Sequence, residues 1–408
     1  MTRNVNCDIS NGRGFMQTIT GTGSSKNALP RAAGTEATER AKRRLGGAKP
    51  AYGFLFAAPD MDLSEALKAA REASGAEMIG CTTAGEITEE GLTHQSVAVM
   101  LVSSEVTLQA RYAEGLKANP RKLAGELWSG TGEVKKAAST RGHRHLTSVL
   151  FTDGLAPTGE RLVGELYDQR VQSGTQIVGG AAGDEGRFAA TAVGAAGRAG
   201  SDACAALHVF GSAQWGLGVD HGLRPTTKAM RVTKAEGNVL KEIEGQPAFA
   251  VYEKHAAERG VRLTKANTGA YLIANELGMH FFERISRARA PLSVGADGSL
   301  VCAGDIPKGS MVSILDGEVT SMVAAARSAA EQARAVLGKQ EAAGVLLFDC
   351  VCRGMILKSE FDREVAAVRS VFRDVPIAGF LTYGEIARSN DKLDGWHNAT
   401  AVVVAIPS

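Results

Sequence analysis

Short apolar runs that end in phenylalanine recur along the chain and predict buried strands. Three such runs occur, at Gly53-Phe54-Leu55-Phe56, Val149-Leu150-Phe151 and Val345-Leu346-Leu347-Phe348. After each run, apolar positions recur with helical spacing, and each helical stretch is preceded by a residue that can cap it, namely Asp62, Thr158 and Ser359. The pattern therefore predicts three strand-helix pairs whose amphipathic helices cover a sheet.

Each predicted helix leads into a second apolar strand that stops at glycine, and the turns that follow share a pattern. The turns are Gly80-Cys81-Thr82-Thr83-Ala84-Gly85-Glu86-Ile87, Gly179-Gly180-Ala181-Ala182-Gly183-Asp184 and Gly379-Phe380-Leu381-Thr382-Tyr383-Gly384-Glu385-Ile386. A third apolar strand closes each unit, at 96–102, 203–210 and 400–406. We therefore predict an α/β fold in which a β-α-β-loop-β unit occurs three times and forms sheets covered by helices. A fourth, more divergent segment from Val301 to Leu337 is expected to carry short strands and an Ala-rich helix.

Two interpretations of these glycine turns remain open. Glycine makes up 48 of the 408 residues, well above the usual share of ~7%. The functional interpretation is that glycine lets the backbone approach a ligand closely, with loops from several units converging on it. The structural interpretation is that the glycines stop strands and allow close packing between units.

Charge and composition exclude several classes of protein. The chain has 46 basic and 44 acidic residues, a formal net charge of +2, which argues against a dedicated nucleic-acid binder. The sequence has no run of about 18 apolar residues, so no membrane span is predicted. Residues 1–34 lack the apolar core of a secretory signal. We expect a cytoplasmic protein with a flexible lead-in at 1–34. The six cysteines are expected to be free thiols, and the close pair Cys350 and Cys352 lacks the spacing of a structural zinc site.

The glycine turns and the segments around them resemble the FIST sensory domain. Residues 79–87 resemble the signature of its N-terminal part, and residues 379–386 that of its C-terminal part. Supporting motifs occur in the family's order, at 153–155, 179–184, 232–238, 245–248, 348–354 and 397–400. The resemblance covers roughly residues 40 to 408. It implies a FIST N-terminal domain at 35–246 and a FIST C-terminal domain at 247–408.

The resemblance implies a bacterial signal-transduction protein that binds a small ligand. Among free-standing members similar to this chain are nitric oxide sensors that bind b-type haem and regulate a partner histidine kinase in a two-component system. A haem-based nitric oxide sensor is thus the sharpest form of the prediction. A sensor of an amino-acid-like metabolite without haem and a protein-binding scaffold are the alternatives. Any signal is expected to leave through a partner protein.

An amphoteric ligand requires a carboxylate for its amino group and a cation for its own carboxylate. Glu86, Asp184 and Glu385 supply the first, and Arg353 supplies the second, although Arg353 can equally pair with Glu385. With the neighbouring turn and motif residues, the predicted ligand-binding set is Cys81, Thr82, Gly85, Glu86, Gly180, Asp184, Cys350, Arg353, Tyr383, Glu385 and Asn398.

A bound haem requires an axial ligand, most often a neutral histidine in an apolar pocket. His397 and His94 precede the closing strands of their units and are the first candidates, with His208, inside an apolar strand, behind them. Catalysis is not expected. No sequence signature places a histidine beside Cys81 or Cys350 to activate the thiol, and the glycine turns lack the patterns of a phosphate-binding or dinucleotide-binding loop.

Overall fold

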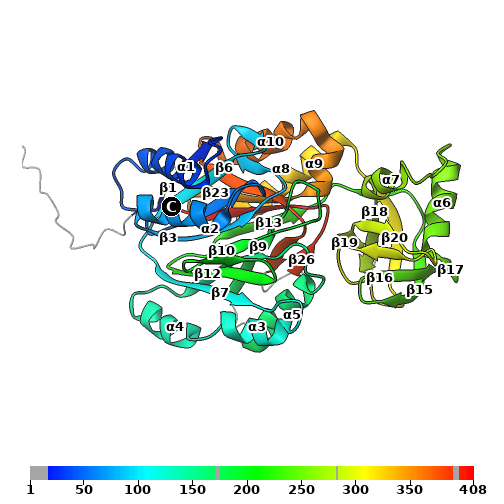
Figure 1. Cartoon of the computed structure of the whole chain (residues 1–408), viewed down its shortest axis with the longest axis horizontal. Helices are drawn as coiled ribbons and strands as arrows, with labels where there is room; N and C mark the ends of the chain where they lie inside the picture. Colours follow the sequence, from blue (N-terminus) through cyan, green and yellow to red (C-terminus); the bar gives the residue numbers. More distant parts are fainter. Residues whose placement is uncertain (1–16, 171–174, 282–283, 389–394) are drawn as a thin grey trace, which may run out of the picture.

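The computed structural model describes residues 17–170, 175–281, 284–388 and 395–408. Cys7 lies outside them. The fold is α/β, with mixed sheets covered by helices, as predicted. Figure 1 shows two parts: a large body, formed by the described residues of 17–223 and 317–408, and a smaller inserted domain, formed by the described residues of 224–316, to one side.

Three consecutive segments of the body build the same order of elements. The first contains β1 (Ile19–Ser25), α1 (Pro30–Arg44), β2 (Tyr52–Ala57), α2 (Leu63–Ser74), β3 (Glu77–Thr82), the hairpin of β4 (Glu86–Thr88) and β5 (Gly91–Thr93), and β6 (Val97–Ser103). The second contains β7 (Thr107–Glu114), α3 (Pro120–Leu127), α4 (Thr131–Thr140), β8 (His145–Thr152), α5 (Gly159–Arg170), β9 (Thr175–Ala181), the hairpin of β10 (Val193–Ala195) and β11 (Arg198–Gly200), and β12 (Ala203–Gly211).

The third segment is interrupted by the inserted domain after its first strand. It contains β13 (Gly216–Asp220), α8 (Val319–Leu337), β23 (Ala342–Cys350), α9 (Val351–Leu357), η1 (Lys358–Glu360), α10 (Asp362–Phe372), β24 (Ile377–Thr382), the hairpin of β25 (Glu385–Arg388) and β26 (Gly395–His397), and β27 (Ala401–Pro407). The predicted fourth segment is therefore not a separate unit, because its helix α8 belongs to the third unit and its strands belong to the inserted domain.

The three sheets of the body have the same strand order. Their first four strands are β1-β6-β2-β3, β7-β12-β8-β9 and β13-β27-β23-β24, and in each sheet the third and fourth strands are parallel. Each sheet is completed by a hairpin from another unit: β10-β11 extends the first sheet, β25-β26 the second and β4-β5 the third. The three units are thus interlocked in a cycle.

Both faces of these sheets are buried, which explains the continuous apolar runs in the sequence. In β2, Phe54 and Phe56 face the centre of the body, whereas Leu55 faces the covering helices. Equivalent phenylalanines from the three units meet at the centre, where the ring of Phe151 lies 5.7 Å from that of Phe56 and 6.1 Å from that of Phe348. The recurring phenylalanine is therefore the shared core of the three units.

The glycine turns that follow β3, β9 and β24 also meet. They form a cycle of backbone hydrogen bonds in which the amides of Ala84, Gly183 and Tyr383 donate to the carbonyls of Leu381, Thr82 and Ala181. The first glycine of each turn is required for packing: a Cβ at Gly379 would lie 1.8 Å from the carbonyl oxygen of Leu347 in the adjacent strand. The three turns therefore lie together, and the first glycine of each turn supports the structural interpretation, in which glycine allows close packing.

Part of the expected flexible lead-in is an ordered strand. Within residues 1–34, β1 pairs antiparallel with β6, and α1 begins at Pro30. The small residues of β1 explain why its sequence looks like a loop. A Cβ at Gly21 or Gly23 would lie about 2.3 or 2.2 Å from carbonyl oxygens of α1, so glycine is required for the close approach of this helix.

The inserted domain contains the fourth sheet, with the strand order β19-β18-β22-β15-β16-β21-β20 and with β14 and β17 pairing at β22 and β16. Its strands are β14 (Arg224–Pro225), β15 (Met230–Glu236), β16 (Val239–Ile243), β17 (Gln246–Pro247), β18 (Asn275–Phe281), β19 (Arg284–Arg289), β20 (Pro291–Val294), β21 (Leu300–Cys302) and β22 (Met311–Asp316), and its helices are α6 (Ala248–Glu258) and α7 (Thr268–Ala274). The domain enters and leaves the body through adjacent strands, since Arg224 pairs with Asp316. In the described part of the chain, no helix is long and apolar enough to cross a membrane.

Candidate functional site

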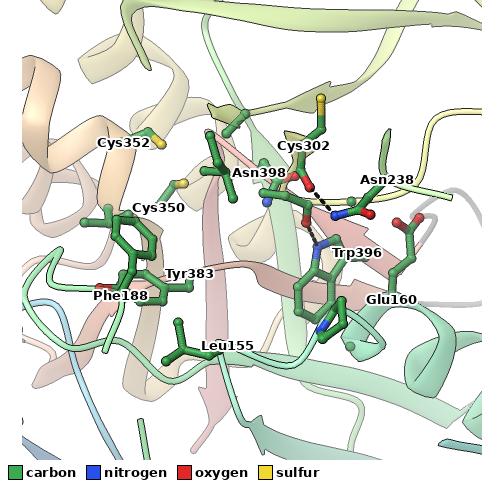
Figure 2. Close-up of a pocket in the computed structure, with 18 of the residues that line it drawn as sticks. Leu155, Glu160, Phe188, Asn238, Cys302, Cys350, Cys352, Tyr383, Trp396 and Asn398 are labelled. Carbon is green, nitrogen blue, oxygen red and sulfur yellow. Dashed lines mark hydrogen bonds between the residues drawn. The ribbon is translucent and has the colours of Figure 1, made fainter. Parts of the chain in front are cut away.

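A cavity of about 220 Å³ lies where the inserted domain meets the body (Figure 2). The body contributes the loop from β8 into α5, the end of β23 with the start of α9, and the turns after β24 and β26. The inserted domain contributes Asn238, Cys302 and residues of α7 and β20. A molecule bound here would contact both parts of the protein.

Most of the cavity wall is apolar. Phe188 stacks on Tyr383 with ring centroids 4.6 Å apart, and Trp396 lies on the opposite part of the wall near Glu160 in Figure 2. Phe188, Leu292 and Met355 are among the few large apolar side chains of the described chain that are exposed. Three exposed apolar groups around one cavity are typical of a ligand-binding or interaction site.

The charged group on the wall is already neutralised. Glu160 accepts a hydrogen bond of 2.8 Å from the guanidinium of Arg289, which is fully buried, and another of 2.7 Å from the backbone amide of Asp305. Arg287 lies 3.4 Å from the same carboxylate. Because Glu160 is paired with arginines from the inserted domain, it joins the two parts of the protein and leaves no free charge for a ligand.

Asn398 differs from the other polar side chains on the wall. Asn238 donates to the carbonyl of Cys302, and the indole of Trp396 donates to the carbonyl of Ala303. Asn398 is 1% exposed, and within the described residues neither its Nδ2 nor its Oδ1 has a hydrogen-bond partner. A buried polar group without a partner costs about 1–3 kcal/mol. Asn398 is therefore the side chain on the described wall that combines a donor and an acceptor, both without a partner among the described residues.

Two thiols lie side by side on the wall. Cys350 ends β23, Cys352 is in the first turn of α9, and Figure 2 shows both sulfur atoms on the same side of the cavity. The contact with Cys352, together with burial, raises the pKa of Cys350 well above its ordinary value. The Cys350 thiol is therefore protonated, and a protonated thiol is a poor nucleophile.

The structure places three of the predicted ligand residues on this wall: Cys350, Tyr383 and Asn398. Two other predicted residues, Glu86 and Glu385, lie behind the turns in equivalent positions. Glu86 accepts hydrogen bonds from Thr83 and Ser96, and Glu385 accepts them from Thr382 and Thr400. Burial raises the pKa of each carboxyl to about 7.

The remaining predicted charges are also paired within the protein. Asp184 accepts hydrogen bonds from the hydroxyl of Tyr383 and from the backbone amides of residues 188–190. Burial opposes ionisation of Asp184, but these hydrogen bonds outweigh it and lower its pKa. Arg353 is fully buried and pairs with Asp349 and Glu364 rather than with Glu385. The cavity thus lacks the opposite charges expected for an amphoteric ligand.

The other predicted ligand residues are part of the packed interior. Cys81 is in the central core, and Gly180 lies in β9, where an added Cβ would be 2.7 Å from the side chain of Thr382. The hydroxyl of Thr82 accepts a hydrogen bond from the amide of Ala192, and Gly85 packs against Leu92. These residues shape the turns and do not line the cavity.

None of the three histidine candidates is among the described residues of the cavity wall. His208 is stacked on Trp128, and its ring nitrogens lie 2.8 Å from Ser148 Oγ and 3.0 Å from the carbonyl of Leu127. Burial lowers its pKa to about 4. His397 Nε2 lies 3.2 Å from the carbonyl of Ala387, and the side chain of His94 is 53% exposed. The described wall does not fit a haem, and the haem prediction stays untested.

Sequence reasoning missed the part of the wall that comes from the inserted domain, as well as Glu160, Phe188 and Trp396. The sequence did contain part of the information needed to find this wall. The motifs that carry the family resemblance include Asn238, and they also include the segment from Asp153 to Leu155, which leads into the cavity. Only the three-dimensional structure brings these motifs next to Asn398.

Comparisons with known proteins agree with this architecture. The FIST N domain matches residues 51–246, and the FIST C domain matches residues 248–388. The chain therefore belongs to the FIST domain proteins, a family associated with sensory signal transduction.

Individual relatives add little to this assignment. An uncharacterized protein of Methanocaldococcus jannaschii, MJ1623, is 38% identical over 82 residues, which are 20% of this chain and 16% of that protein. The structure of phosphoribosylformylglycinamidine synthase II from Thermotoga maritima aligns with 96% of this chain, and the alignment covers 72% of the synthase chain, with 10% sequence identity and a TM-score of 0.22. With so low a TM-score, the alignment indicates neither a shared fold nor a shared activity.

Proposed function

We propose that this protein senses a small molecule, which binds in the cavity between the body and the inserted domain. The observation that carries the proposal is a cavity with aromatic walls and one buried amide, Asn398, whose polar atoms have no partner among the described residues. Membership of the FIST domain proteins supports a sensory role. The protonated thiol of Cys350 supports binding rather than catalysis.

The position of the cavity suggests how binding is transmitted. A ligand that contacts Tyr383 on the body and Leu292 on the inserted domain favours the arrangement in which both surfaces touch it. Burying the exposed apolar side chains at the rim adds to that preference. A partner signalling protein, such as a histidine kinase, would then recognise the changed position of the inserted domain.

A blocking variant tests this proposal. Leu292 is 42% exposed at the rim, so Leu292→Trp should fill the mouth of the cavity without disturbing the core. The matched control is Val336→Trp, at a residue of similar exposure (45%) on α8 that does not line the cavity. Thermal unfolding is measured with the twenty amino acids, the nucleobases and haemin as ligands.

A ligand of the cavity should raise the melting temperature of the native protein and of Val336→Trp but not that of Leu292→Trp. At a concentration 100 times its dissociation constant, it should stabilise the fold by about 2.7 kcal/mol. An equal rise in Leu292→Trp would show that the ligand binds elsewhere.

A further inference from the structure

The chemistry of the cavity wall narrows the class of ligand. We infer that the cavity binds an uncharged molecule whose apolar body carries a carboxamide or lactam, and that Asn398 recognises this group through one donor and one acceptor. This inference rests on the proposed function and specifies the ligand of the same site.

The first argument is the hydrogen-bonding capacity of Asn398. Its side chain offers a donor at Nδ2 and an acceptor at Oδ1 on one planar edge. Both atoms are buried and have no partner in the described part of the chain, and the residue lines the cavity. A ligand that presents an acceptor and a donor side by side satisfies both, as a carboxamide or a lactam does. A carboxylate has no donor, and a protonated amine has no acceptor.

The second argument is the absence of free charge on the described wall. The carboxylate of Glu160 is satisfied by Arg289 and by the amide of Asp305. Arg353 is paired with Asp349 and Glu364. A charged ligand would move from water into a cavity that offers it no opposite charge, and such a transfer is strongly unfavourable.

The third argument is the shape of the apolar lining. The stacked rings of Phe188 and Tyr383 and the indole of Trp396 provide flat surfaces. The polar atoms of these rings are already engaged, since the Tyr383 hydroxyl donates to Asp184 and the Trp396 indole donates to Ala303. These residues therefore contact the apolar body of the ligand, and Asn398 forms hydrogen bonds with its polar group.

Three probes of almost the same shape test the inference on the full-length protein. Benzamide is neutral and has a donor and an acceptor, benzoate is an anion with acceptors only, and benzamidinium is a cation with donors only. Fragments of this size bind with dissociation constants on the order of 1 mM, so binding is measured by ligand-observed NMR titration. We expect benzamide to bind at least about tenfold more tightly than either ion, since each ion leaves one atom of Asn398 unpaired, which forfeits about a factor of ten.

Variants of Asn398 separate recognition by the amide from simple filling of the cavity. Asn398→Leu, which keeps the branched shape and the number of side-chain heavy atoms but has no polar group, should weaken the binding of benzamide about tenfold. Asn398→Asp should reverse the preference in favour of benzamidinium, because a carboxylate pairs with an amidinium through two hydrogen bonds. The control is Asn119→Asp, which adds the same charge at an exposed helix cap outside the cavity, and there benzamide should remain preferred.

The outcomes also distinguish the ligand class from the site. If benzoate or benzamidinium binds best to the native protein and Leu292→Trp removes that binding, the amide assignment is wrong and the cavity remains the ligand site. The amide assignment is also wrong if Asn119→Asp reverses the preference as Asn398→Asp does, or if none of the three probes binds. If Leu292→Trp leaves binding unchanged, the cavity is not the ligand site and the proposed function itself is wrong.

Discussion

Glu86 and Glu385 are buried carboxyl groups that hold two glycine turns in shape. Each one accepts hydrogen bonds from a hydroxyl three residues earlier and from the first residues of the strand that closes its unit. The second unit lacks a glutamate at the equivalent place. There Asp153, which follows β8, accepts hydrogen bonds from Thr191 and from the amide of Asp202. The acid that ends the second turn is Asp184, which is also buried and accepts hydrogen bonds from the backbone amides of residues 188–190.

The burial of Glu86 predicts that the stability of the protein depends on pH, and Glu86→Gln should reduce this pH dependence. The pKa of Glu86 is about 7 in the folded protein, against an ordinary value of 4.5. Between these pH values the folded state holds more protons than the unfolded chain, so the free energy of unfolding falls as pH rises, by up to about 1.4 kcal/mol per unit. Glutamine can keep the hydrogen bonds, because the hydroxyls of Thr83 and Ser96 also accept.

Urea denaturation between pH 5 and pH 8 measures the effect. As the pH rises across this range, the free energy of unfolding of Glu86→Gln should increase relative to that of the native protein by up to about 3 kcal/mol. The exposed neighbour provides the control: Glu90→Gln should keep the native pH profile. Parallel profiles for Glu86→Gln and the native protein would show that this carboxyl does not titrate with folding.

At the residue scale, the sequence predicts the turns better than the cavity. Tyr383 lies in a glycine turn, Cys350 and Asn398 lie in motifs that carry the family resemblance, and all three line the cavity. Glu385 lies in the same turn as Tyr383 and Arg353 in the same motif as Cys350, but both side chains are buried in the protein interior. Proximity to a turn does not determine which side chains face a cavity, because direction alternates along a strand and rotates along a helix.

Elements are positioned by glycines that allow two backbones to approach each other. Gly379 in β24 lies against β23, where an added Cβ would be 1.8 Å from the carbonyl oxygen of Leu347. Gly80 and Gly179 occupy the same place in the first two units, with added Cβ atoms 2.5 and 1.9 Å from the carbonyls of Leu55 and Leu150. The parallel strand pair of each unit therefore requires glycine.

Gly379→Ala should strongly destabilise the protein. The new methyl group overlaps a backbone atom that cannot move without breaking the sheet, so we expect a loss of about 3 kcal/mol or more in the free energy of unfolding. Gly164→Ala is the matched control. Gly164 is in α5 with no atom within 4 Å of an added Cβ, and alanine there should stabilise the helix by about 0.5–1 kcal/mol. Urea denaturation of both variants measures the difference, and a loss below about 1 kcal/mol in Gly379→Ala would contradict the packing role.

The repeated strands and helices could be predicted because both faces of each sheet are covered, which leaves long apolar runs and amphipathic helices in the sequence. The short hairpins were not predicted. The strands β4 and β10 have three residues each and pair with strands of other units, so no local pattern marks them. Likewise β1 was taken for a flexible lead-in because its glycines, which allow α1 to pack, are typical of loops.

The whole molecule combines an interlocked body with a domain inserted into one of its three units. Each sheet of the body needs a hairpin from another unit, so no single unit can complete its own sheet. The inserted domain differs, because it has its own core around Val232, Tyr252 and Ile314. The boundary between the two FIST domains, near residue 247, falls within the inserted domain, so the division along the sequence and the division in space differ.

Removing the inserted domain should therefore abolish ligand binding while the body still folds. Arg224 and Asp316 are partners across adjacent strands, so a two-residue Asn-Gly turn can join them in place of residues 225–315. The body loses the pairing of Glu160 with Arg289 and the contact of Trp396 with Ala303, and its stability should fall. Its three sheets keep all their strands.

Circular dichroism should show a single cooperative thermal transition for this shortened chain, because the hairpin exchange couples all three units. Ligand-observed NMR should show no binding of benzamide, since the part of the wall formed by Asn238, Leu292 and Cys302 has been removed. Loss of the cooperative transition would mean that the inserted domain is needed to fold the body. Retained binding would place the ligand on the body alone, and the inserted domain could then no longer be the element that the ligand repositions.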